Sequence, residues 1–158
     1  MARLQSIRRR LRSAAGLDAR QAAMIAEAAV LLSWYRAVVQ FVPRTRLKHW
    51  LGDFVTPADP RVAIAMAPGT PEQAETAAYV RRAVASAART PLFRGVCLPQ
   101  AMAGRTMLKR RGIVTVMRFG AGPGKDKPLE AHAWLDAAGV KVTGYPVAPN
   151  LAEIACFL

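Results

Sequence analysis

Two side chains in the second half of the chain are of the types that carry out thiol chemistry. The first is Cys97, in the segment R-G-V-C-L-P-Q-A, where a loop after Pro91 is predicted to turn into a helix. The unpaired N–H groups and the positive dipole end of a helix start favour thiolate, the nucleophilic form of cysteine. Most free cysteines are small buried hydrophobic residues, so this position alone does not establish catalysis.

The second side chain is His132, in the segment E-A-H-A-W-L-D. Alternation along a strand places His132, Trp134 and Asp136 on one face. A lone strand histidine is more often structural than catalytic. Only one predicted helix and one predicted strand separate it from Cys97, however, and this path is short enough to return the chain to the same site. A Cys and a His are the minimum for thiol catalysis, because imidazole takes the proton and later returns it to the leaving amine.

The sequence does not fix a third group that would orient the imidazole. Asp136 shares the strand face of His132, but four strand residues span about 13 Å, so direct contact requires the strand to end before Asp136. The neighbouring strand should pass His132 near residues 142–144, which include no acid. The other candidates are Asp126, Glu130, Gln100, Thr143 and a backbone carbonyl.

The remaining cysteine and histidine are predicted to be structural. Cys156 lies in the apolar segment I-A-C-F-L, and His49 in R-L-K-H-W-L-G reads as a packing or partner-facing residue. Two cysteines and two histidines are too few for a zinc-finger ligand set, and neither H-E-x-x-H nor C-x-x-C spacing is present. We expect no metal and no cofactor.

The elements that must position these residues begin with helices. Leu4, Ile7 and Leu11 recur at helical spacing, and Asp18 is a candidate cap for a helix over residues 19–41 that ends before Pro43. A short helix over 44–51 should stop at Gly52, and residues 56–69 read as a loop. Residues 70–73, T-P-E-Q, predict a capping box that starts a helix running to about residue 88.

In the second half of the chain the predicted elements are a helix followed by strands. They are a helix over residues 96–110 stopped by Gly112, strands over 113–119, 130–136 and 139–144, and an irregular tail from Pro146. Helices followed by a helix and three strands indicate an α+β fold. We expect a helical N-terminal region over residues 1–55 and a core over residues 56–158, together forming one compact unit.

The charge balance is strongly basic. The 158 residues include 23 Lys and Arg against 10 Asp and Glu, a net charge of +13, which suits an anionic partner such as nucleic acid, a membrane surface or an acidic peptide.

The apolar stretch over residues 22–42 follows a basic start, but Glu27 and Arg36 interrupt it, and each charge at the centre of a membrane span costs about 2.5–3.5 kcal/mol. We therefore expect a buried or partner-facing helix, a cytoplasmic protein with free thiols, and at most peripheral membrane contact.

Three segments together resemble a known family. The runs P-L-F-R-G-V-C-L-P-Q-A, M-L-K-R-R-G-I and A-H-A-W-L-D-A-A-G-V-K-V, within residues 90–145, are similar to the transglutaminase-like cysteine peptidases that remove the leader in lasso peptide biosynthesis. The resemblance implies a transglutaminase-like or papain-like helix with a small antiparallel sheet. It also implies a Cys-His-Asp triad of Cys97 as nucleophile, His132 as base and Asp136 as the motif-matched acid.

The same resemblance implies partners. A short chain without a fused recognition module looks like the split form of these peptidases. That form acts on the precursor's leader with a separate leader-recognition protein, and a macrolactam cyclase acts next. In the expected mechanism, backbone N–H groups around Leu98 hold the oxyanion. The helices of the first half also carry an apolar face, which we expect either to be buried against the core or to dock on a partner. Its residues are Leu31, Trp34, Val38 and Phe41.

Two other functions fit parts of the pattern. Another transglutaminase-like acyl transferase or amidase would keep Cys97 and His132 and differ only in the acyl acceptor. A basic module that binds nucleic acid would explain the charge, but no helix-turn-helix, RNP or zinc signature is present and the arginines are scattered. We therefore expect no nucleic-acid partner.

Overall fold

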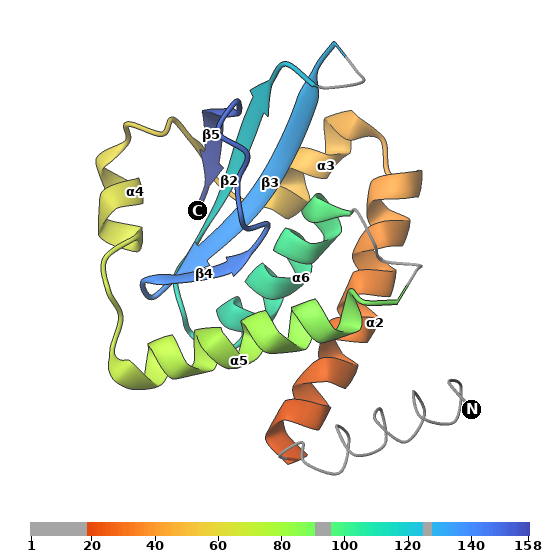
Figure 1. Ribbon diagram of the computed structural model, residues 1–158, viewed down its shortest axis with the longest axis vertical. Helices are drawn as coiled ribbons and strands as arrows, with labels where there is room; N and C mark the ends of the chain where they lie inside the picture. The colour runs from red at the N-terminus through yellow and green to blue at the C-terminus, as the bar shows by residue number, and fades with distance from the viewer. Residues whose placement is uncertain (1–18, 91–95, 125–127) are drawn as a thin grey trace, which may run out of the picture.

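The computed structural model describes residues 19–90, 96–124 and 128–158, in which helices pack on one antiparallel sheet (Figure 1). This mixture of helices and antiparallel strands confirms the α+β class. The helical spacing predicted around Leu4, Ile7 and Leu11 and the Asp18 cap lie outside the described residues.

The first two described helices have the bounds that the sequence predicts. They are α2 (Ala19–Phe41) and α3 (Arg44–Leu51). Pro43 separates them because it has no N–H to continue the helical hydrogen bonds. Gly52 ends α3 with a φ of 100°, a backbone conformation that side chains with a Cβ rarely adopt.

The next predicted helices are also confirmed. α5 (Pro71–Ala87) begins with a capping box in which the Gln73 backbone N–H donates to the Thr70 hydroxyl at 3.3 Å. The Thr70 N–H donates in return to the Gln73 side chain at 3.0 Å. α6 (Cys97–Lys109) is followed by Gly112 at a φ of 68°. The local start and stop signals therefore fixed both helices to within about a residue.

The loop predicted over residues 56–69 is wrong in part, because it contains the short helix α4 (Pro60–Ala65). The Asp59 carboxylate accepts a hydrogen bond from the Arg61 backbone N–H at 2.9 Å. Pro60 occupies the first turn, where its missing N–H costs nothing. The Asp-Pro pair is thus a helix start, which the crowding of prolines in this stretch obscured.

Five antiparallel strands form the sheet in the order β1-β5-β2-β3-β4. Their bounds are Phe54–Val55 (β1), Thr115–Gly122 (β2), Glu130–Ala137 (β3), Val140–Thr143 (β4) and Ala152–Phe157 (β5). β3 and β4 form the predicted hairpin. Its turn residues Ala138 and Gly139 have φ values of 50° and 76°, as tight hairpin turns require.

The prediction of an irregular tail is wrong at its end, because β5 enters the sheet between β1 and β2. Cys156 pairs with Arg118 of β2 on one side and with Val55 of β1 on the other. These partners are remote in sequence, and six weakly alternating residues carry no local mark of them. The strand predicted over residues 113–119 is also displaced, since β2 begins at Thr115 and ends at Gly122.

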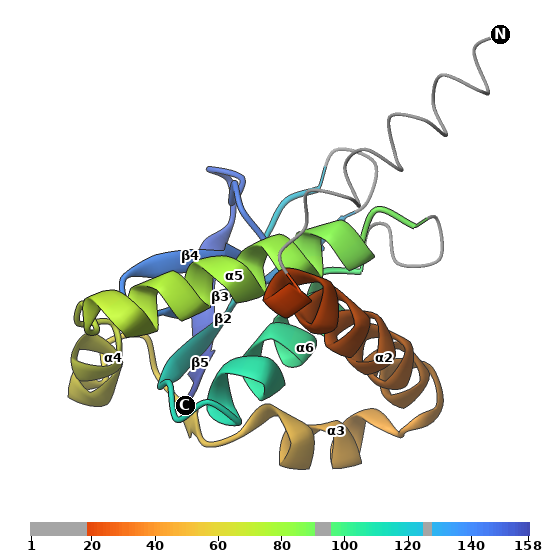
Figure 2. The same cartoon turned by 90° about the horizontal axis from the view of Figure 1, so that it is seen from below.

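The elements are arranged in layers. α5 and α6 pack on one face of the sheet, and α2 lies across both of them (Figure 2). One hydrophobic core joins these helices to the sheet through buried residues such as Leu32, Met107 and Leu135. On the opposite face, Val116 and Cys156 pack with Val62 of α4 in a second, smaller cluster. The described part of the predicted N-terminal region therefore shares its core with the rest of the chain.

α2 is long and apolar enough to cross a membrane by length and composition, a test that core helices and signal sequences also pass. Leu31 and Val38 are buried against the core. Trp34 and Phe41, from the same predicted apolar face, are 54% and 81% exposed. Burial in the core therefore explains only half of that face.

Candidate active site

Cys97 is the first residue of α6 and is half-buried. The backbone N–H of Gln100 donates to the Val96 carbonyl at 3.3 Å, and Pro99 has no N–H. The N–H groups of Cys97 and Leu98 are therefore the first-turn donors that have no partner within the helix. The Leu98 N–H expected to hold an oxyanion is thus present at the start of α6, next to the thiol-bearing residue.

Cys97 opens onto a pocket of about 310 Å³ between α6 and the second half of α2. From α2, Arg36, Val39 and Gln40 line this pocket. The sequence pattern did not single out Arg36 and Gln40 as site residues, and Arg36 stood out only as an interruption of an apolar stretch. Their spacing of four residues on a mostly apolar helix is the signal that would have placed them together on one face.

His132 is the third residue of β3 and is partly buried. Its Nε2 lies 2.6 Å from the carbonyl oxygen of Gly144, just after β4. Because a carbonyl can only accept, this bond requires the proton on Nε2 and leaves Nδ1 as the ring nitrogen able to take a proton. The imidazole also stacks on Trp134, with ring centroids 6.2 Å apart and planes 19° apart.

Cys97 and His132 lie toward the same end of the molecule. A short connection leads from the end of α6 to Thr115, which pairs with Ala137 at the end of β3. α6 and β3 therefore run in the same general direction, and their first residues lie toward the same end (Figure 1).

The two side chains are nevertheless not in contact. Ala133 and Leu135 of β3 belong to the core beneath α6, so alternation directs His132 and Trp134 to the opposite face. No hydrogen bond joins Cys97 to His132 in the described part of the chain.

Asp136 is buried on the face of β3 that carries His132 and Trp134, but other groups engage it. The Tyr145 hydroxyl donates to Asp136 Oδ1 at 2.6 Å, and the Arg118 Nε lies 3.4 Å from Oδ2. Burial raises the pKa of Asp136, while these two neighbours oppose the rise. Burial also raises the pKa of Tyr145, and the hydrogen bond to Asp136 adds to that effect. Asp136 is therefore tied to Tyr145, the residue that follows the carbonyl holding His132.

Among the candidate orienting groups, a backbone carbonyl, that of Gly144, is the one that touches the imidazole in the described residues. A side chain does not fit at this position, since a Cβ on Gly144 would overlap the Ala133 carbonyl and the Trp134 side chain, and φ is 79°. Thr143 Oγ1 is buried without a hydrogen-bond partner, and Glu130 is exposed at the start of β3. Asp126 lies outside the described residues.

Cys156 lies in a different environment. It is fully buried on β5, and its thiol donates to Glu153 Oε1 at 2.9 Å. Glu153 in turn pairs with Arg118 Nη1 at 2.9 Å. Burial, followed by the hydrogen bond and charge of Glu153, raises the pKa of Cys156 to about 12. The thiol therefore stays protonated at neutral pH.

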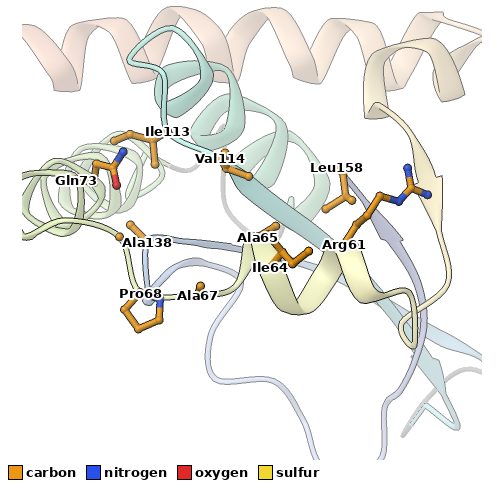
Figure 3. Close-up of a pocket in the computed structure, with 11 residues that line it drawn as sticks. Arg61, Ile64, Ala65, Ala67, Pro68, Gln73, Ile113, Val114, Ala138 and Leu158 are labelled. Carbon is orange, nitrogen blue, oxygen red and sulfur yellow. The ribbon is translucent and has the colours of Figure 1, made fainter.

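A larger cavity, of about 370 Å³, lies at the other end of the sheet. Ile64 and Ala65 of α4 face Ile113, Val114 and Ala138 across it (Figure 3). Neither Cys nor His lines it, so it does not extend the candidate site. Nowhere in residues 19–90, 96–124 and 128–158 do three His, Cys, Asp or Glu side chains converge as metal ligands.

One comparison with known proteins bears on this arrangement. A family model described as the transglutaminase-like superfamily matches residues 38–155, a stretch that contains both Cys97 and His132. The chain belongs to the transglutaminase-like superfamily. This superfamily generally includes cysteine peptidases and acyl transferases. No curated protein and no solved structure matches the chain.

Proposed function

We propose that this transglutaminase-like protein is a cysteine peptidase that removes the leader from a lasso peptide precursor. Cys97 is the nucleophile and His132 is the general base and acid. The observation that carries the proposal is the half-buried thiol at the first residue of α6, in a pocket and beside two N–H groups that have no partner within that helix. A histidine whose Nδ1 is left to accept a proton begins a strand toward the same end of the molecule.

The reaction follows acyl-enzyme chemistry. Nδ1 of His132 takes the thiol proton, and Cys97 Sγ attacks the carbonyl carbon at the junction of leader and core. The Leu98 N–H donates to the oxyanion. The C–N bond then breaks as His132 returns the proton to the core amine. Water, deprotonated by His132, attacks the thioester, releases the leader as a carboxylic acid and restores the thiol.

This chemistry sets a condition on the geometry. Proton transfer needs Nδ1 within about 3.2 Å of the thiol, whereas His132 now stacks on the opposite face of β3. Catalysis therefore requires the imidazole and the start of α6 to approach each other when the precursor is bound. Gly144 bears on this step because its carbonyl holds Nε2 and thereby selects the reactive tautomer.

The proposal includes the partners that the resemblance implies. A separate leader-recognition protein delivers the precursor, and a macrolactam cyclase uses the freed core amine. The reaction belongs in the cytoplasm, where Cys97 and Cys156 remain reduced thiols. An acyl transferase with the same Cys97 and His132 would instead pass the acyl group to an amine.

A cleavage assay separates these activities. A full-length lasso precursor, its recognition protein and this protein are incubated with and without a primary amine such as dansylcadaverine, and products are identified by mass spectrometry. Hydrolysis gives a leader that ends in a free carboxylate even when the amine is present. A leader that carries the amine indicates a transferase, and an intact precursor contradicts both. Cys97→Ala is the inactive control, and Cys156→Ala is the matched cysteine variant.

A further inference from the structure

A third pocket, of about 250 Å³, lies between α2, α3 and α6, away from the Cys97 pocket. Three of the residues that line it are basic: His49 of α3 and Arg105 and Lys109 of α6. No Asp or Glu is among its lining residues. His49, predicted from the sequence to be a packing or partner-facing residue, is exposed at this pocket.

Arg105 is the unusual member of this basic group because it is only 5% exposed. One of its nitrogens, Nη2, donates to the Leu158 carbonyl at 2.6 Å, while Nε is buried with no hydrogen-bond partner. No carboxylate side chain forms an ion pair with Arg105 in the described residues, although Asp53 is near enough to act on it electrostatically. Because Leu158 already takes a hydrogen bond from Arg105, an added carboxylate would be attracted chiefly by the positive charge that Arg105 and Lys109 together place at the pocket.

Two aromatic residues, Tyr35 and Trp50, are among those that line this pocket, and Trp34 lies next to Trp50. Trp50 lies 6.4 Å from Tyr35 and 6.2 Å from Trp34, measured between ring centroids. Trp34 and Trp50 are 54% and 43% exposed, so apolar surface borders the basic pocket on its outer side. Arg105 at the base, with exposed basic and aromatic side chains around it, suits a segment that has an acidic side chain followed by apolar ones.

The burial of Arg105 favours a peptide over a nucleic acid. A phosphodiester carries a sugar on each side and meets basic side chains at an exposed surface. A carboxylate at the tip of a flexible Asp or Glu side chain enters a narrow pocket more easily. Lys109 would then contribute the exposed part of the attraction.

The position of the pocket relative to Cys97 sets a spacing. Arg105 follows Cys97 by eight residues of α6, a rise of about 12 Å. An extended peptide covers that distance in about four residues. Tyr35 lines this pocket and its neighbour Arg36 lines the Cys97 pocket, so α2 forms a wall of both.

We propose that the pocket of His49, Arg105 and Lys109 binds an Asp or Glu side chain of the peptide substrate, about four residues from the scissile bond. This proposal rests on the proposed peptidase function, because it names the feature of the precursor that the protein recognises. The pocket thereby selects acidic peptide segments and sets their register along α2 and α6.

The test measures binding without cleavage. Cys97→Ala protein is titrated into fluorescein-labelled Gly-Ser-Leu-Glu-Phe-Gly-Ser or its Gln counterpart, and anisotropy is followed. We expect the Glu peptide to bind about tenfold more tightly, which corresponds to one buried charge-assisted contact. Adding Lys109→Gln should weaken Glu-peptide binding about three- to fivefold, and adding Trp50→Ala should weaken both peptides. Arg81→Gln, which removes an exposed charge from α5, is the matched control and should change binding less than twofold.

Equal affinity for the Glu and Gln peptides would overturn the proposal, as would a loss in Arg81→Gln equal to that in Lys109→Gln. So would a single-stranded oligonucleotide that binds more tightly than the Glu peptide and is weakened by Lys109→Gln, since the pocket would then serve nucleic acid. Failure of the proposed function is distinguishable. If the protein binds the Glu peptide but cleaves no precursor, the result supports the proposed pocket and contradicts the proposed peptidase function. If the protein cleaves the precursor but its KM stays the same when an acidic residue about four positions from the scissile bond is changed to its amide, the result contradicts the proposed pocket.

Discussion

The start of α6 and the strand β5 each carry one of the two cysteines, and they surround the two thiol groups with opposite environments. Cys97 is half-buried and lines a pocket together with Arg36, at the start of a helix whose first N–H groups have no partner within the helix. Cys156 is fully buried, donates to the Glu153 carboxylate and has its pKa raised to about 12. Reactivity is therefore decided by the surroundings that the fold builds and not by the residue type.

The largest expected difference is in cleavage. Cys97→Ala should lower the peptidase rate by more than about 10⁴-fold, because no other group forms the acyl-enzyme. Cys156→Ala should keep the rate and cost about 1 kcal/mol of unfolding free energy through the small cavity that it leaves. Precursor cleavage and urea unfolding measure the two effects. Equal rates for the two variants would remove the distinction between the cysteines.

His132→Ala should lower cleavage by about 10²–10⁴-fold, the usual contribution of a general acid and base. In the free protein the alkylation rate of Cys97 by iodoacetamide should stay the same, because His132 contacts Gly144 and Trp134 there and not the thiol. Cys156 should stay unreactive because its thiol remains protonated. Peptide mass spectrometry reads the two cysteines separately in one sample. Unchanged cleavage would show that the imidazole takes no part in catalysis.

Tyr145→Phe tests whether the hydrogen bond between Tyr145 and Asp136 helps to hold the neighbouring Gly144 carbonyl against His132. The variant leaves buried Asp136 without its 2.6 Å donor, which should cost about 1–3 kcal/mol of unfolding free energy. The Gly144 carbonyl should then hold Nε2 less firmly. Long-range ¹H–¹⁵N NMR of His132 should show the protonated-Nε2 tautomer in the wild type and a mixture in the variant. An unchanged tautomer would separate Asp136 from the orientation of His132.

The raised pKa of Cys156 also predicts a loss of stability in alkaline solution. The unfolded thiol loses its proton near pH 9 and the folded thiol near pH 12, so the folded state binds more protons between them. Stability should therefore fall as pH rises above 9, by at most about 1.4 kcal/mol per pH unit from this group. Urea unfolding at pH 8 and 10 should show a smaller fall in Cys156→Ala than in the wild type. An identical fall in the two proteins would contradict the assignment.

The smallest expected effect is that of Glu153→Gln. The change removes a charge and a carboxylate acceptor from Cys156, so the pKa of that thiol should fall, although burial still keeps it above its ordinary value. Alkylation of Cys156 at pH 9 should rise a few-fold and remain well below that of Cys97. No rise would mean that burial alone protects the thiol.

Local sequence signals predicted much of the fold. The capping box at Thr70 and Gln73, the break at Pro43 and the stop at Gly52 each act within a few residues, so they could be recognised without a tertiary structure. The β3–β4 hairpin was predictable for the same reason. β5 was not, because its place between β1 and β2 depends on partners remote along the chain.

The same division applies to the candidate site. That Cys97 begins a helix and that His132 shares a strand face with Trp134 followed from local pattern. That the Gly144 carbonyl holds the imidazole, that Arg36 and Gln40 border the thiol, and that Asp136 is tied to Tyr145 did not. Each of these contacts joins different elements, and short patterns do not encode how elements approach one another.

By itself, the sequence determined where α2, α3, α5 and α6 begin and end, that the fold is α+β, and which thiol stands at a helix start. The tertiary structure alone decided that Cys156 is protected, which face of β3 carries His132 relative to α6, and that basic residues of α3 and α6 meet under Trp50. The physical reason is range. Capping and turn preferences act between neighbours in the chain, whereas burial, ion pairing and pockets arise only when distant segments pack together.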